Sequence, residues 1–209
     1  MKTFKRISIR LMAIAAVALC FALPANAQIN PNWYFNADWQ FNAPLKNHFS
    51  DKASGWGMNF EGGYYVAPKF GIGLFLNYHT NNEYIPRETF MISETGTLTT
   101  DQQHTIFQLP FGATMKYRFT TSAVQPYIGV KLGANYAKMS SSFTWLRETD
   151  DNWGFYVSPE IGLNIYPFAN NGFGFHIAAF YSYSTNQGSV LHYDIDKLSN
   201  AGFRLGITF

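Results

Sequence analysis

Seven charged side chains stand in segments that are otherwise rich in apolar residues, and they are the residues best suited to do chemistry. They are Asp38, Glu61, Lys116, Arg118, Lys131, Glu160 and Arg204. Opposite charges in apolar surroundings can form an ion path or a binding pocket, or they can form a structural network of ion pairs. We favour the structural network, because a charge that is buried without a partner is costly.

Histidine residues offer a second kind of chemistry. His192 and Asp194 stand close together in a polar stretch and are the best candidates for a catalytic histidine with an acidic partner. A solvated loop is the simpler interpretation of the same residues. His79 and His104 could approach each other, but two histidines without a third ligand do not predict a metal site. We therefore predict neither an enzymatic activity nor a bound cofactor.

The composition excludes an ordinary water-soluble domain. Of the 209 residues 47% are hydrophobic and 18% aromatic, but only 13% are charged, whereas an average soluble domain carries about 25% charged residues. The many aromatic residues also exclude a disordered chain. The mean hydropathy of −0.12 is too low for a helical membrane protein. These values favour segments that each have one apolar face.

Residues 1–27 have the pattern of a cleaved secretory signal peptide. Basic residues come first, an apolar run extends from Leu11 to Leu23, and Ala25-Asn26-Ala27 resembles a cleavage site. We therefore expect a single mature domain over residues 28–209. Removing the four basic residues of the leader changes the formal net charge from +2 to −2, so no basic patch predicts nucleic-acid binding. The one cysteine, Cys20, lies in the leader, which excludes disulfides in the mature domain.

Beyond residue 28 polar and apolar residues alternate with a period of two, which is typical of β-strands. We predict eight strands, over residues 33–42, 56–66, 70–79, 104–119, 128–136, 153–165, 173–184 and 203–209. Short turns (67–69, 120–124, 169–171) alternate with long polar connections (43–54, 80–103, 138–151, 185–198). This arrangement predicts an up-and-down meander. Pro110 and Pro159 fall within strands, where we expect β-bulges.

The two faces of these strands indicate which side is outside. The apolar faces carry no charge and place aromatic residues near the strand ends, whereas the polar faces are rich in Gly, Asn, Ser and Tyr. A lipid-facing exterior and a polar interior explain both features. We therefore predict an all-β fold, an eight-stranded antiparallel up-and-down transmembrane β-barrel. Eight strands leave an interior that side chains fill, in which Asp38 would pair with Arg204 and Lys131 with Glu160.

The leader, the eight strands and the alternation of long and short connections resemble the small outer-membrane β-barrel family, which includes OmpA/OmpX-like and porin-family barrels. The final strand, with Phe203, Leu205, Ile207 and the terminal Phe209, is similar to the signal that the barrel-assembly machinery reads. The resemblance implies a Gram-negative outer membrane as the location. It also implies outer-membrane lipid, lipopolysaccharide and the assembly machinery as partners.

The resemblance is specific for architecture and weak for activity, because a fold does not determine a function. We expect a structural or surface-interaction role, namely membrane integrity, adhesion or recognition of an extracellular partner through the long loops. The 80–103 connection, with Tyr84 and Ile85, is either a protruding loop that makes such contacts or a solvated variable loop. One alternative is a narrow channel or small-ligand conduit. A second is a lipid A-modifying enzyme that uses His192 at the rim.

Overall fold

The computed structural model describes residues 32–45, 49–93, 96–143, 146–168, 172–190 and 193–209. Within these ranges the chain forms ten strands. They are β1 (Trp33–Pro44), β2 (Gly57–Ala67), β3 (Phe70–Ser93), β4 (Gly96–Arg118), β5 (Val124–Phe143), β6 (Leu146–Ile165), β7 (Gly174–Ser184), β8 (Gly188–Val190), β9 (Tyr193–Ile195) and β10 (Leu198–Thr208). No helix of the described residues is long and apolar enough to cross a membrane.

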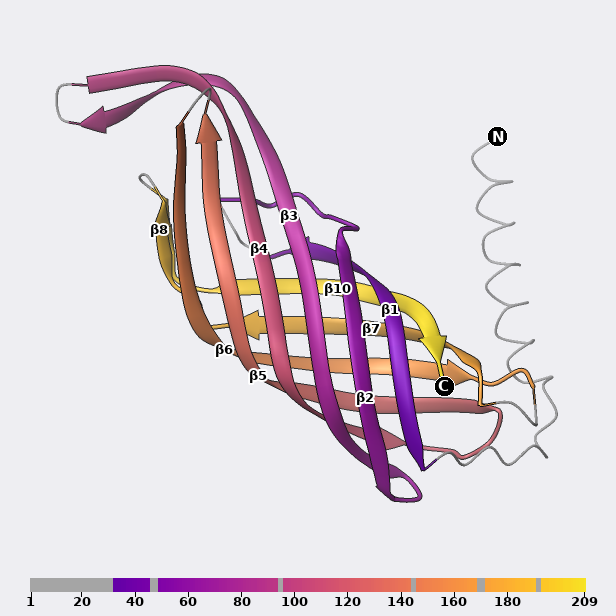
Figure 1. Ribbon diagram of the computed structural model, residues 1–209. Coiled ribbons are helices and arrows are strands. Elements are labelled where there is room, and N and C mark those ends of the chain that lie inside the picture. The colour runs from indigo at the N-terminus through magenta and orange to yellow at the C-terminus, as the bar shows by residue number, and fades with distance from the viewer. Residues whose placement is uncertain (1–31, 46–48, 94–95, 144–145, 169–171, 191–192) are drawn as a thin grey trace, which may run out of the picture.

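Eight of the described strands close into a barrel in the order β1-β10-β7-β6-β5-β4-β3-β2 (Figure 1). All neighbours are antiparallel, and β1 closes the ring by pairing with β2 on one side and with β10 on the other. The prediction of an eight-stranded antiparallel up-and-down barrel is therefore confirmed. The remaining strands, β8 and β9, form a separate short hairpin.

The polar and apolar residues that alternate along each strand also alternate between the buried interior and the exposed outside of the barrel. On β1 the side chains of Tyr34, Asn36 and Asp38 are buried in the lumen, whereas Trp33 and Trp39 are exposed on the outside by 60% and 44%. Successive side chains of a strand point to opposite faces, so each strand places its polar residues inward and its apolar residues outward. The apolar face is outside, as the sequence predicts.

The last strand follows the same rule. Phe203, Leu205 and Phe209 are exposed by 38%, 42% and 38%, whereas Arg204 and Thr208 are fully buried. Phe203 also stacks on Phe41 of β1, with ring centroids 5.1 Å apart. The outward apolar row that we predicted is thus present, and its role as an assembly signal stays a prediction.

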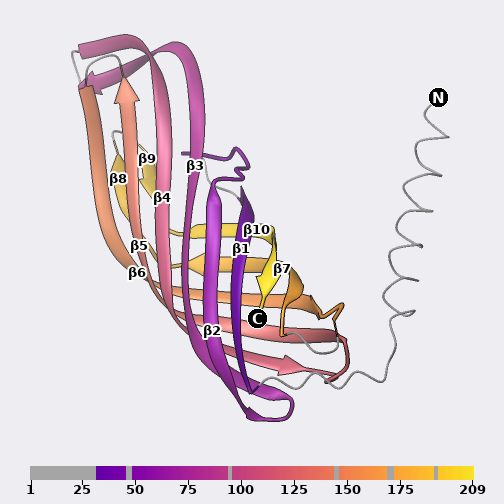
Figure 2. The ribbon, with the colours of Figure 1, turned by 45° about the vertical axis from the view of Figure 1, so that its right-hand side comes forward.

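Two hairpins continue far beyond the barrel. Most of the connections 80–103 and 138–151, which we predicted to be polar loops, extend the strands of these hairpins: residues 80–93 and 96–103 continue β3 and β4, and residues 138–143 and 146–151 continue β5 and β6 (Figures 1 and 2). The ladder of β3–β4 runs on to Ser93↔Gly96, and that of β5–β6 to Phe143↔Leu146. Neither face of the β3–β4 extension needs to be apolar, so the period of two is lost there. The Thr and Ile residues of the β3–β4 extension still favour strands.

The two strand prolines interrupt ladders without changing the register. The β3–β4 ladder has no pair at Pro110, and the β6–β7 ladder has none at Pro159, yet both resume in the same register. The predicted bulges at these two residues are therefore wrong. A proline lacks the N–H that a ladder needs, and here the strands tolerate the missing hydrogen bond.

An apolar cluster lies above the lumen at the end of the barrel that carries the long connections. This mouth cluster consists of Phe49, Ile106, Ala137, Met139, Val190, Ile195 and Leu198. It joins inward residues of β4 and β5 to the β8–β9 hairpin, which lies within the connection 185–198 that we predicted to be a loop. The mouth cluster therefore anchors the β8–β9 hairpin over the polar interior.

Candidate functional site

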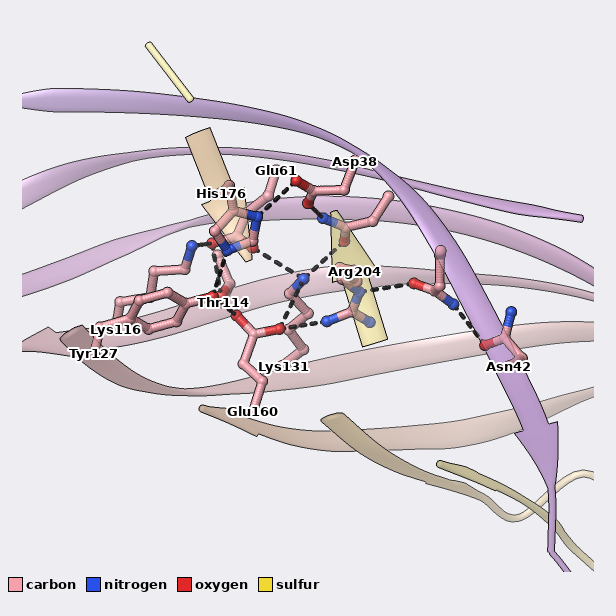
Figure 3. A network of polar contacts seen from close by, with 12 residues as sticks. Asp38, Asn42, Glu61, Thr114, Lys116, Tyr127, Lys131, Glu160, His176 and Arg204 are labelled. Atoms are coloured by element: carbon pink, nitrogen blue, oxygen red, sulfur yellow. Dashed lines mark hydrogen bonds and ion pairs between the residues drawn. The ribbon is translucent and has the colours of Figure 1, made fainter. Parts of the chain in front are cut away.

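Six of the seven charged residues that we predicted to form a network meet in the lumen (Figure 3). Each comes from a different part of the ring, and the period of two turns all of them inward. Asp38 lies on β1, Glu61 on β2, Lys116 on β4, Lys131 on β5, Glu160 on β6 and Arg204 on β10. The side chains of all six residues are fully buried.

Glu61 binds two lysines. Its Oε1 lies 2.8 Å from Lys116 Nζ and its Oε2 lies 2.9 Å from Lys131 Nζ. The Thr114 hydroxyl also donates to Oε1, over 3.3 Å. This carboxylate therefore ties β2 to β4 and β5 across the lumen.

Glu160 forms the second centre. Its Oε2 lies 3.3 Å from Lys131 Nζ, which is the ion pair that the sequence predicts, and it also accepts a hydrogen bond from Arg204. Its Oε1 accepts a hydrogen bond of 3.0 Å from the Tyr127 hydroxyl. Lys131 therefore links the two glutamates into one continuous cluster.

The predicted pair of Asp38 with Arg204 is wrong. Asp38 contacts His176 Nδ1 at 2.6 Å and accepts from the Asn59 amide at 2.6 Å. Arg204 instead donates from Nε to Gln40 Oε1 over 2.7 Å and from Nη1 to Glu160. The pairing of β1 with β10 explains why Asp38 and Arg204 have other partners. In this register Arg204 lies opposite Gln40, and Asp38 lies opposite Gly206.

Tyr127, His176 and Asp38 form a chain of hydrogen bonds. The Tyr127 hydroxyl lies 2.7 Å from His176 Nε2, and His176 Nδ1 lies 2.6 Å from Asp38 Oδ1. The order hydroxyl, imidazole and carboxylate is the geometry of an activated nucleophile. All three side chains are buried, with Tyr127 and His176 at 0% exposure, and the same hydroxyl donates to Glu160. In this setting the chain holds β5, β7 and β1 together.

Aromatic rings fill the space around the cations. Lys116 Nζ lies 4.8 Å from the centroid of the Tyr34 ring and 4.5 Å from that of Tyr127. The Arg204 guanidinium lies 4.0 Å from the Phe180 centroid. Cation–π contacts of this kind stabilise buried cations. Together with the balanced charges, they describe a packed polar core.

Arg118 belongs to a different part of the lumen. Its Nε donates to the Pro68 carbonyl over 2.7 Å, and its guanidinium lies 3.6 Å from the centroid of the Tyr65 ring. It also donates to Gln125 Oε1 over 3.3 Å. Arg118 is therefore a lumen residue, as predicted, but it stabilises the short-turn end.

Sequence reasoning missed the neutral members of the network. Asn59, which donates to Asp38, also accepts from Lys131 Nζ over 2.7 Å, and Gln40 donates to Asn42 over 2.8 Å. The alternation already places these residues inward. Their contacts depend on how neighbouring strands are staggered, and the sequence does not show that stagger.

The histidine candidates are not brought together into a metal site. No group of three or more His, Cys, Asp or Glu side chains in the described ranges could hold a metal ion. His104 Nδ1 contacts the Phe49 carbonyl at 2.7 Å, and its ring stacks on Phe49 at 4.1 Å. His104 thus supports the mouth cluster. His192 and the side chain of Asp194 lie outside the described residues.

Comparison with known proteins assigns the family. The model of the outer membrane protein beta-barrel domain matches residues 13–209. The chain belongs to this family. The predicted resemblance is thereby confirmed, and membership implies the Gram-negative outer membrane as the location. No curated protein sequence matches the chain.

Several solved outer-membrane proteins are similar to this family member. The attachment invasion locus protein Ail of Yersinia pestis, solved with a heparin analogue, has a TM-score of 0.47 and 15% identity over 86% of this chain and 100% of its own. Neisserial surface protein A has a TM-score of 0.49 and 16% identity over 85% and 96%. OprG of Pseudomonas aeruginosa has a TM-score of 0.48 and 15% identity over 87% and 97%.

Family membership also orients the barrel. In outer-membrane barrels the short turns face the periplasm and the long connections face the exterior. The extended β3–β4 hairpin is therefore extracellular. There the Tyr84 side chain is 55% exposed, and its hydroxyl donates to Asp101 Oδ2 over 3.3 Å. The nearby Asp101 carboxylate raises the pKa of Tyr84 above its usual value.

Proposed function

We propose that this outer-membrane protein acts at the cell surface, through contacts that its extended β3–β4 and β5–β6 hairpins make with an extracellular partner. One observation carries the proposal. The barrel part of β3 ends its pairing with β2 at His79↔Gly57, yet β3 and β4 remain paired as far as Ser93↔Gly96. A long paired segment of sheet, with register shifts between Ile85 and Glu88 and between Met91 and Ser93, thus stands outside the barrel.

Cross-strand contacts within the β3–β4 hairpin support a binding role. The Thr89 and Thr99 hydroxyls lie 2.7 Å apart across the β3–β4 ladder, and the Thr105 hydroxyl donates to Asn82 over 2.8 Å. A sheet held by such cross-strand contacts is already ordered. Binding then costs less conformational entropy than it would for flexible loops.

The lumen supports a structural role for the barrel itself. An ion network of fully buried side chains occupies the middle of the interior, and aromatic rings surround its cations. This packing speaks against the alternative of an open conduit. We infer that the network stabilises the barrel on which the hairpins stand.

A shortened hairpin tests the proposal. Glu88 and Thr100 are cross-strand partners, so residues 89–99 can be replaced by Asn-Gly, a two-residue turn that favours hairpins. Cells of a deletion strain that express the full or the shortened chain are then compared for adhesion to immobilised matrix proteins and glycans. We expect the shortened chain to lose adhesion, while the barrel keeps its unfolding temperature.

The variant Arg204→Ala provides the opposite control, because it weakens the barrel and leaves the extended hairpins intact. We expect it to lower the unfolding temperature without reducing adhesion per folded molecule. Equal adhesion by the full and the shortened chain would contradict the proposal. The proposal would also be contradicted if adhesion by the shortened chain and by Arg204→Ala fell only in proportion to the amount of folded barrel.

A further inference from the structure

A shallow groove of about 550 Å³ lies on the outer face of β2, β3 and β4, away from the lumen. Its floor is formed at Gly62 and Ala113, and its walls by Tyr64, Ile72, Leu74 and Met115. The side chains that line it are almost entirely apolar.

The cross-strand register explains the groove. Leu74 lies opposite Gly62 on one side and opposite Ala113 on the other, while Ile72, one step nearer the turn, lies between Tyr64 and Met115. Two small residues therefore flank Leu74, and its side chain is 71% exposed. The outer surface of the barrel thus has a hollow beside the projecting side chain of Leu74. On the side nearer the turn, the larger side chains of Tyr64, Ile72 and Met115 bound this hollow.

The height of the groove is set by the turn between β2 and β3. Leu74 follows the turn residue Lys69 by five positions, and a strand rises by about 3.3 Å per residue. Since the short turns face the periplasm, the exposed Lys69 lies at the headgroup level of the periplasmic leaflet. The groove then lies in the hydrocarbon region of that same leaflet.

We propose that the groove binds one acyl chain of a glycerophospholipid of the periplasmic leaflet, whose phosphate contacts the Lys69 ammonium. Inside a bilayer the hydrophobic effect does not distinguish one apolar surface from another, and close packing decides what binds. A hydrocarbon chain can enter the hollow and pack along Leu74. A lysine near the membrane surface adds electrostatic attraction for the phosphate.

The experiment counts phospholipids that stay bound. The full chain is reconstituted in nanodiscs of phosphatidylethanolamine and phosphatidylglycerol, released into detergent and examined by native mass spectrometry. Ala113→Leu fills the groove. Ala179→Leu is the matched control, because Ala179 is exposed on the outer face of β7, far from β2 and β3 in the ring. Gly62→Ala is a second groove variant, since its new Cβ would meet only ordinary contacts such as Phe35 at 3.5 Å.

We expect one phospholipid to remain bound to the wild-type chain and to the Ala179→Leu chain. Ala113→Leu is expected to lower the retained fraction about tenfold, and Gly62→Ala to lower it less. Lys69→Gln is expected to lower the retention of phosphatidylglycerol about fivefold. Heat-dependent gel mobility checks that each variant is folded.

Two results would overturn the proposal. In the first, Ala113→Leu and Ala179→Leu retain the same amount of phospholipid as the wild type. In the second, the wild-type chain is a dimer that Ala113→Leu dissociates, which would show that a second copy occupies the groove.

Discussion

Single residues of the lumen matter through the partners they share. Glu160 contacts Lys131, Arg204 and Tyr127. A substitution at any of these residues therefore changes the contacts of the others. A buried ion pair adds little to stability relative to well-packed apolar residues, but the loss of one partner is expensive. The network should therefore behave as one unit when a member is removed.

Arg204→Ala tests this behaviour. It leaves Glu160 with fewer partners and removes the cation that packs on Phe180. We expect the free energy of unfolding to fall by about 3–5 kcal/mol, measured by denaturant unfolding in detergent micelles. Arg87→Ala, at an exposed position of the β3 extension, is the control and should change stability by less than about 0.5 kcal/mol. An unchanged midpoint for Arg204→Ala would show that the network does not stabilise the barrel.

Tyr127→Phe isolates one hydroxyl of the same network. The substitution removes the hydrogen bond to Glu160 and the contact with His176, and it keeps the ring beside Lys116. We expect a loss of about 1–3 kcal/mol in the same unfolding assay. Tyr64→Phe, on the exposed outer face, is the matched control. Equal midpoints for the two variants would argue against the hydrogen-bonded chain.

At the scale of strands, the close approach of β4 and β5 depends on a pair of glycines. Gly112 and Gly133 lie opposite each other, and a Cβ on Gly133 would lie 2.0 Å from the Phe111 carbonyl oxygen and 2.8 Å from Gly112 Cα. The backbone of the neighbouring strand cannot move away without disturbing the ladder. Only glycine fits this position.

Gly133→Ala should therefore destabilise the barrel by about 1–3 kcal/mol through overpacking, measured as a lower temperature of the heat-dependent shift in gel mobility. Gly62→Ala serves as the control, because its Cβ would meet nothing closer than 3.5 Å. A Gly133→Ala chain that unfolds at the wild-type temperature would contradict the close approach of the two strands.

The elements that the sequence predicts well are those with one face toward lipid and one toward the lumen. On β7, the alternation of Phe175, His176 and Ile177 indicates the strand and its inward face directly. The β3 extension lacks this signal, because both of its faces stand outside the membrane, and it was therefore predicted as a loop. The pairing of Arg204 with Glu160 escaped prediction for another reason. It depends on contacts across the lumen, which neither spacing nor alternation encodes.

At the scale of the whole molecule, the barrel is a filled cylinder whose two ends differ. Short turns end it on the periplasmic side, and on the other side the mouth cluster lies above the lumen. The buried cations and their aromatic neighbours occupy the middle of the interior. This arrangement predicts how the protein behaves toward ions.

We expect no steady single-channel current when the wild-type chain is inserted in planar bilayers. A path through the lumen would have to break the contacts of Glu61 and Glu160, and each charge released would lose its buried partners. Reproducible ohmic current steps that track the amount of inserted protein would contradict a filled lumen and favour the channel alternative.

The register between β1 and β10 has a consequence for the order of assembly. Pairs within β3–β4 or β5–β6 join residues much nearer in the sequence than Asn36↔Thr208, which joins the first strand of the barrel to the last. The buried charges come from both ends and from the strands between them. Until the first and last strands meet, Arg204 lacks Gln40 beside it. We therefore expect a barrel whose first and last strands pair out of register to lose this contact and to reopen more easily than a correctly closed one.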